Sequence, residues 1–83
     1  MENLSEIISQ IPMYKVTSSN LEAIGYNPDK QVMRVIFKGG SSYLYYQVEP
    51  ETWNMIINSE SKGKTLNESV IKQKEKYKFI RTN

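Results

Sequence analysis

Apolar residues follow a helical spacing in the first part of the chain. Within residues 1–12 they recur at i, i+3, i+4 and i+7, which places them on one face of a short helix: Leu4, Ile7, Ile8 and Ile11. The helix should end before Pro12, because proline disfavours helical geometry in the residue that precedes it. A helix this short is marginal in water on its own. We therefore expect its apolar stripe either to dock on the sheet of the same chain or to bind another protein, including a second copy.

From Met13 to Glu49 the period of the pattern changes to two, which is typical of β-strands. Turn-forming residues at Asn27–Lys30 and Gly39–Ser41 separate the apolar runs. Closely spaced turns of this kind predict antiparallel pairing of consecutive strands. The expected strands are Met13–Thr17, Leu21–Tyr26, Val32–Phe37 and Ser42–Val48, and the alternation at Tyr77–Arg81 marks a candidate last strand.

Helical signals return after this β region. Pro50 suits the first position of a helix, which we expect over residues 50–59. Its buried face carries Trp53, Ile56 and Ile57. Gly63 follows and is expected to take the left-handed conformation that ends a helix.

The segment Thr65-Leu66-Asn67-Glu68 has the pattern of a capping box, so a second helix is expected over residues 65–75. Together the patterns predict one α+β domain. Its core is an antiparallel β-meander of three to five strands, with the helices of residues 50–59 and 65–75 packed on one face. The short N-terminal helix of residues 1–12 is added to this domain.

Composition narrows the chemistry that the chain can perform. Its 83 residues contain neither cysteine nor histidine, which removes disulfides, thiolate metal ligands and the commonest general base. Asp29 is the one aspartate and lies in an expected turn. We therefore expect a non-enzymatic protein without a metal or cofactor. No apolar run approaches the ~20 residues of a membrane span, and residues 1–12 lack the basic start of a secretory signal, so we expect a cytoplasmic location.

Charge is distributed unevenly along the chain. Residues 1–61 hold four basic and seven acidic residues, whereas residues 62–83 hold seven basic and two acidic residues. A basic segment on a mildly acidic body is typical of a surface that binds phosphates. It is equally typical of a solvated helix and strand. The candidate phosphate contacts are Lys62, Lys64, Lys72, Lys74 and Lys76.

Tyrosine is concentrated in the strand expected at Ser42–Val48. Tyr43 and Tyr45 share one face of it. If the hairpin loop is Gly39–Ser41, Tyr43 lies opposite Phe37 and Tyr45 opposite Val35. Such a surface is either the core beneath the helices or an exposed platform on which bases stack. Tyr46, near Arg34 on the opposite face, is a second candidate platform.

The segment Ser61-Lys62-Gly63-Lys64 precedes the predicted capping box. Hydroxyl, ammonium and backbone N–H groups at the start of a helix suit a phosphate. An ordinary solvated turn explains the same residues. The pattern of a Walker A loop is absent, so nucleotide hydrolysis is not indicated.

Several of these segments together resemble the KTSC domain family over about residues 16–80. The matching residues are Ser18-Ser19, Ile24-Gly25-Tyr26, Val35-Ile36-Phe37, Tyr43-Leu44-Tyr45, Val48-Glu49-Pro50, Ser61-Lys62-Gly63, Asn67 and Ile71. This family occurs at the C-terminus of some lysyl-tRNA synthetases and as small proteins of bacteria and phages, and the synthetase context implies RNA binding. We assign residues 13–83 to a KTSC-like domain. The resemblance does not extend to the helix of residues 1–12.

Two functional hypotheses follow. The first is a binding module for a phosphate-bearing ligand, with RNA as the first candidate. The second candidate ligand is a small nucleotide, which a phage relative could sequester. The alternative is a protein-interaction module that acts through the N-terminal stripe or an edge strand, including self-association.

Overall fold

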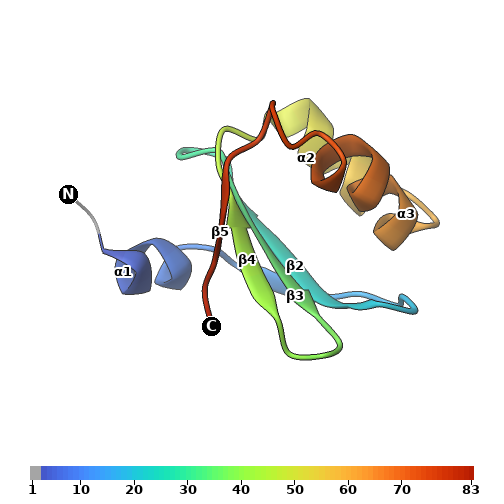
Figure 1. Ribbon diagram of the computed structural model, residues 1–83, viewed down its shortest axis with the longest axis horizontal. Coiled ribbons are helices and arrows are strands. Elements are labelled where there is room, and N and C mark those ends of the chain that lie inside the picture. The colour runs from blue at the N-terminus through green and yellow to red at the C-terminus, as the bar shows by residue number, and fades with distance from the viewer. Residues whose placement is uncertain (1–2) are drawn as a thin grey trace.

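A five-stranded antiparallel sheet organises the chain in the computed structural model, which describes residues 3–83 (Figure 1). The strands follow one another in sequence order across the sheet, so the expected meander is confirmed. The elements are α1 (Leu4–Ser9), β1 (Met13–Lys15), β2 (Leu21–Asn27), β3 (Val32–Phe37), β4 (Ser42–Tyr45), α2 (Pro50–Ile57), α3 (Lys62–Leu66), the π-helix η1 (Asn67–Ile71) and β5 (Phe79–Arg81).

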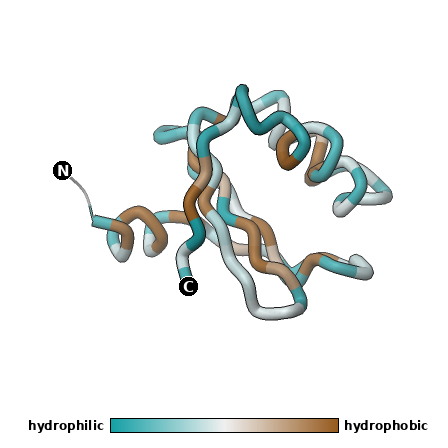
Figure 2. Tube along the Cα trace, in the orientation of Figure 1, coloured by the Kyte–Doolittle hydropathy of each residue, from teal (hydrophilic) through white to brown (hydrophobic). Residues whose placement is uncertain are grey.

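The sheet separates two hydrophobic clusters of unequal size (Figure 2). The larger cluster lies beneath α2, α3 and η1, and it includes Tyr26, whose ring stacks on Trp53 at a centroid distance of 5.3 Å. The smaller cluster lies beneath α1 and contains Ile11, Val32 and Leu44. The α+β class is therefore confirmed, with α1 on the face opposite to the other helices.

The N-terminal stripe docks on its own sheet. Ile11 is buried, Ile7 and Ile8 are half-buried, and Leu4 remains 42% exposed. The first two residues of the predicted segment 1–12 lie outside the described residues. Because three of the four stripe residues already pack on the sheet, α1 offers a partner little more than Leu4.

The β3–β4 hairpin has a different register from the expected one. Val35 lies opposite Tyr43 and Met33 opposite Tyr45, so the predicted pairs are wrong by two residues. The loop is Lys38–Gly40, closed by a hydrogen bond from the Phe37 amide to the Ser41 carbonyl. Gly40 has a φ of 99°, which the last residue of this three-residue loop requires. Both tyrosines nevertheless stay on the predicted face, because a shift of two residues preserves it.

Three strands are shorter than expected. The strand expected at 42–48 stops at Tyr45, because Gln47 adopts a φ of 57° and turns the chain out of the sheet. The strand expected at 13–17 ends at Lys15, and the one expected at 77–81 begins at Phe79.

The second helix on the larger core begins and ends earlier than predicted. It starts at Lys62, and the Thr65 hydroxyl bonds the Ser59 hydroxyl at 2.7 Å instead of capping a helix. Gly63 is not left-handed; it lies in the first turn, where a Cβ would meet the Asn20 side-chain oxygen at 2.5 Å. The helical segment ends at Ile71 rather than at residue 75.

Candidate functional site

An open cleft lies between the sheet and η1, and we call it the aromatic cleft. Its cavity volume is about 290 Å³. Strands β3, β4 and β5 supply aromatic rings, η1 supplies Ile71, and the loop after η1 supplies a lysine. The lining residues are Phe37, Ser41, Tyr43, Tyr45, Ile71, Lys74 and Phe79.

The rings of the aromatic cleft pack on one another with Tyr43 at their centre. Tyr43 meets Phe37 at 5.9 Å and Phe79 at 6.2 Å, both in edge-to-face geometry. Tyr45 lies 5.6 Å from Phe79 between ring centroids. Such contacts stabilise ring orientation beyond the area buried. The four rings therefore form a connected wall.

Exposure within this wall divides the rings into supporting and accessible ones. Tyr45 is 5% exposed, whereas Phe79 is 47% exposed. Burial raises the pKa of the Tyr45 hydroxyl, with a smaller contribution from Tyr43, so the group stays protonated at neutral pH. Of the two predicted tyrosines, Tyr45 is part of the core and Tyr43 is half-buried.

Phe79 was not among the residues selected from the sequence. It joins the cleft because β5 pairs with β4, with Tyr45 opposite Phe79 and Tyr43 opposite Arg81. The alternation at 77–81 already placed Phe79 and Tyr77 on one face of a strand. The missing information was the partner of that strand, which the local pattern does not contain.

The basic segment between η1 and β5 is a loop, whereas the helix expected over residues 65–75 would have included Lys72 and Lys74. The side chains of Lys72, Lys74 and Lys78 are exposed and have no hydrogen bond or ion pair within residues 3–83. Lys76 is paired with Glu49 at 3.0 Å and lies 5.1 Å from the centre of the Tyr77 ring. Lys72, Lys74 and Lys78 are therefore the unpaired cations of this loop, and of these Lys74 lines the aromatic cleft.

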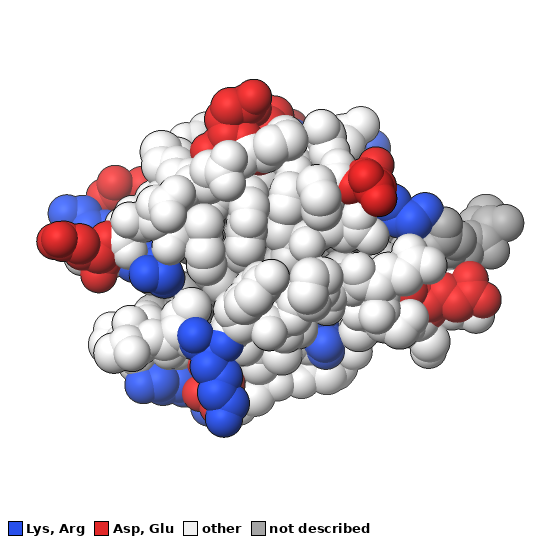
Figure 3. All heavy atoms as spheres, turned by 180° about the vertical axis from the view of Figure 1, so that it is seen from behind, with Lys and Arg blue, Asp and Glu red and all other residues white. Residues whose placement is uncertain are grey.

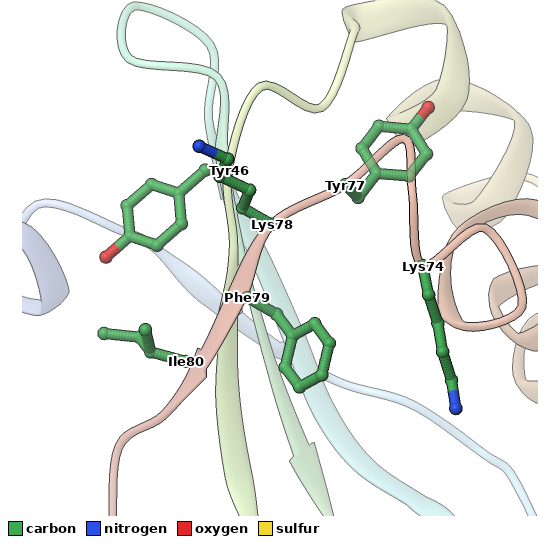
Figure 4. A pocket seen from close by; sticks show the side chains of 6 residues that line it. All are labelled: Tyr46, Lys74, Tyr77, Lys78, Phe79 and Ile80. Atoms are coloured by element: carbon green, nitrogen blue, oxygen red, sulfur yellow. The ribbon is translucent and has the colours of Figure 1, made fainter.

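Lys74 borders both the aromatic cleft and a second cavity of about 410 Å³ around β5. Figure 4 shows this second cavity, with Tyr46 and Ile80 on one side of β5 and Phe79 and Lys74 on the other. The Lys74 side chain extends across from the Phe79 ring. A positive charge thus lies beside the most exposed ring of the cleft.

Glu49 fastens the lysine loop to the start of α2. Its carboxylate accepts a hydrogen bond from the Tyr77 hydroxyl at 2.6 Å and pairs with Lys76. The pKa of Glu49 is lowered to about 2, first by the Tyr77 hydroxyl, then by its own backbone N–H, and then by Lys76. At pH values above the ordinary pKa of a glutamate, the carboxylate is therefore ionised and holds the loop against α2.

We expect Glu49→Gln to lower the thermal unfolding midpoint near pH 6 and to lose this effect in acid. Because the folded-state pKa of Glu49 is depressed, its stabilisation is complete above pH 4.5 and is lost as pH falls toward 2. Thermal unfolding followed by circular dichroism between pH 6 and 2 measures the difference from the unchanged protein. Glu51→Gln is the control, since no ion pair of Glu51 occurs within residues 3–83. If the difference in unfolding midpoint between Glu49→Gln and the unchanged protein stayed constant from pH 6 to 2, the role of the carboxylate would be contradicted.

The predicted Ser61–Lys64 site contributes to a separate, polar cleft of about 300 Å³. Its other lining residues include Glu60 and the loop at 17–20. The Lys62 ammonium donates to the Ser59 carbonyl at 2.9 Å. Glu60 places a negative charge in this cleft beside Lys62 and Lys64.

Arg34 and Tyr46 do not join either cleft. Tyr46 is half-buried against the smaller cluster beneath α1, and Arg34 is partly buried on β3. The Arg34 Nε is buried and has no hydrogen-bond partner within residues 3–83. Tyr46 also lines the second cavity around β5, together with Lys74 and Lys78, whereas Arg34 does not.

The face behind the view of Figure 1 carries mixed charge. Figure 3 shows acidic and basic side chains interspersed around the rim of this face, with an uncharged centre. Within residues 3–83 no helix has the length and apolar character to cross a membrane. The same residues contain no group of three acidic side chains placed to hold a metal ion.

The molecule is a small α+β domain, in which a five-stranded meander carries helices on both faces and an aromatic cleft on one of them. The family model of the KTSC domain matches residues 17–77. The chain therefore belongs to the KTSC domain family, as the resemblance predicted. The match excludes α1, β1 and β5, and Phe79 lies just beyond its end.

Relatives of the domain occur in several bacteria. A protein from Tsukamurella paurometabola is 44% identical over 55 residues, which cover 66% of this chain and 82% of that protein. An uncharacterized protein from Stutzerimonas stutzeri is 33% identical over 60 residues, covering 72% and 84% of the two chains. The crystal structure of a KTSC domain protein from Yersinia pestis has a TM-score of 0.75 at 27% identity, covering 88% of this chain and 99% of that chain.

Proposed function

We propose that this protein is a non-catalytic binding module for a phosphate-bearing ligand, with RNA as the first candidate and a small nucleotide as the second. One observation carries the proposal. The aromatic cleft combines an accessible ring, Phe79, with an unpaired ammonium group, Lys74, in one cavity. A nucleotide offers the matching pair of groups, a flat base and a phosphate.

The energetics of the two contacts favour such a ligand. Stacking of a base on an aromatic side chain contributes about 1–3 kcal/mol. Phosphate contacts by lysine add affinity through release of condensed counterions. Lys72 lies in the same loop as Lys74 and extends the positive surface beyond the cleft.

The proposal contains no catalytic step. The chain has no histidine or cysteine, and the titratable groups that line the aromatic cleft are two tyrosines and Lys74. The tyrosine hydroxyls can form hydrogen bonds with a bound ligand, and the Lys74 ammonium group offers it a positive charge. Binding alone accounts for their arrangement.

The test is a titration of the purified chain against RNA pools at two salt concentrations. We expect saturable binding at low salt and an affinity that falls about tenfold or more between 50 and 200 mM salt, because several lysine–phosphate contacts release counterions. Mononucleotides and cyclic dinucleotides are titrated in parallel to detect a small-nucleotide ligand. No binding in either arm would remove this class of function.

A second candidate is a protein-interaction module, favoured by the outer edge of β5. Phe79 and Ile80 are exposed on this edge strand, on its two opposite faces. In the antiparallel ladder, Lys78 and Thr82 bond to β4, so the backbone groups of Phe79 and Arg81 point outward. A strand from a partner or from a second copy would pair there. Silent RNA and nucleotide titrations would favour this candidate over the first.

A further inference from the structure

We infer that the aromatic cleft takes one unpaired base of a single-stranded RNA, with Phe79 as the ring on which the base stacks. This inference rests on the proposed function and names its ligand class and its principal contact. It excludes duplex RNA as the preferred ligand. It also assigns the stacking role to a residue outside the matched KTSC segment.

Phe79 is the accessible ring of the wall. Tyr45 lies opposite Phe79 in the β4–β5 pair and Tyr43 is its diagonal neighbour, while 47% of the surface of Phe79 is open to solvent. A ring flanked on its β4 side by two others loses little further freedom when a base stacks on it. Tyr45 is buried and contributes support rather than a stacking surface.

The shape of the cleft favours a single base. The rings of Phe37 and Phe79 meet Tyr43 at interplanar angles of 81° and 65°, so they enclose a hollow rather than form a flat row. Ile71 closes the opposite side. In a duplex both faces of each base are already stacked, and only unpaired bases can be turned out into such a hollow.

The lysines beside the cleft lie where the phosphate backbone of the bound RNA strand would pass. Figure 4 shows Lys74 on the same side of β5 as Phe79, and Lys72 lies two residues before Lys74 in the same loop. Their ammonium groups have no partner within residues 3–83. A phosphate next to the stacked base would meet Lys74 first.

The experiment measures fluorescence anisotropy of a labelled single-stranded RNA and of the same strand annealed to its complement, at low salt. The variants are Phe79→Ala, which removes the ring, and Phe79→Trp, which keeps an aromatic surface. Tyr14→Ala is the matched control, because Tyr14 is a 52% exposed aromatic on the edge strand β1. Circular dichroism confirms that each variant is folded.

We expect the single strand to bind at least about tenfold more tightly than the duplex. Phe79→Ala should weaken single-strand binding by about 5- to 100-fold, as loss of one stacked base predicts. Phe79→Trp and Tyr14→Ala should stay within about threefold of the unchanged protein.

Equal affinity for both RNAs, or an affinity that Phe79→Ala leaves unchanged, would overturn the inference while phosphate binding itself would stand. An absence of binding to any RNA would overturn the proposed RNA binding together with the inference. Phe79→Leu keeps an apolar side chain on β5 and replaces Phe79→Ala if the alanine variant does not fold.

Discussion

Gly25→Ala is expected to lower the free energy of unfolding by about 3 kcal/mol, as overpacking of a filled site does. Gly25 lies on β2 opposite Met13 of β1, beneath the segment that joins α1 to the sheet. A Cβ at this position would clash with the Pro12 carbonyl oxygen and lie 2.5 Å from the Met13 sulfur. The backbone of the α1–β1 segment would have to move away, which exposes Ile11.

Gly39→Ala is the matched control. A Cβ at Gly39 meets no atom within 4 Å, and its φ is not positive. We expect its free energy of unfolding to stay within about 0.5 kcal/mol of the unchanged protein, as for most surface substitutions. Urea denaturation followed by Trp53 fluorescence measures both variants. Equal stability of the two would show that α1 and β1 are not packed on the sheet as described.

Replacing Lys72 and Lys74 together by alanine is expected to reduce RNA affinity about tenfold at low salt and to reduce the salt slope of log affinity by about 2. Each lysine that contacts a phosphate contributes about one counterion to that slope. Both side chains are exposed, so their removal should leave stability unchanged. Affinities across a salt series, measured for the double variant and the unchanged protein, give the two slopes.

Lys15→Ala serves as the control, because Lys15 is an exposed lysine on β1 and lies outside the aromatic cleft. Its slope should match that of the unchanged protein. If the double variant and this control gave the same slope, the lysine loop would not be the phosphate-binding surface.

The strands could be predicted from the sequence because their signals are local. Val32–Phe37 has the bounds that its β-branched residues predicted. The face shared by Tyr43 and Tyr45 was also predictable, since it depends only on alternation. The register was not, because it depends on which glycine of the loop takes the positive φ, and the chain uses Gly40.

Signals that depend on distant contacts were misleading. Thr65 has the sequence of a helix cap, yet its hydroxyl bonds Ser59 and the helix starts three residues earlier. Gly63 has the sequence of a helix terminator, yet it serves the close approach of Asn20. In both cases the partner comes from packing between segments, which local pattern does not encode.

The candidate site was predicted in part. Tyr43, Tyr45 and Lys74 come together in the aromatic cleft, whereas the Ser61–Lys64 segment belongs to another cleft and Arg34 with Tyr46 to neither. Phe79 completes the site through the pairing of β5 with β4. The sequence therefore identified the residue types of the site, and tertiary pairing determined which of them share a cavity.

Backbone amide NMR shifts recorded while single-stranded RNA is added would show which cleft binds the ligand. We expect the largest changes at Phe37, Lys74 and Phe79, whose side chains line one cleft. Residues of α1 and of the loop at 17–20 should change little. Largest changes in the polar cleft, at residues 17–20 and 60–64, or along the α1 face, would contradict the assignment of ligand binding to the aromatic cleft.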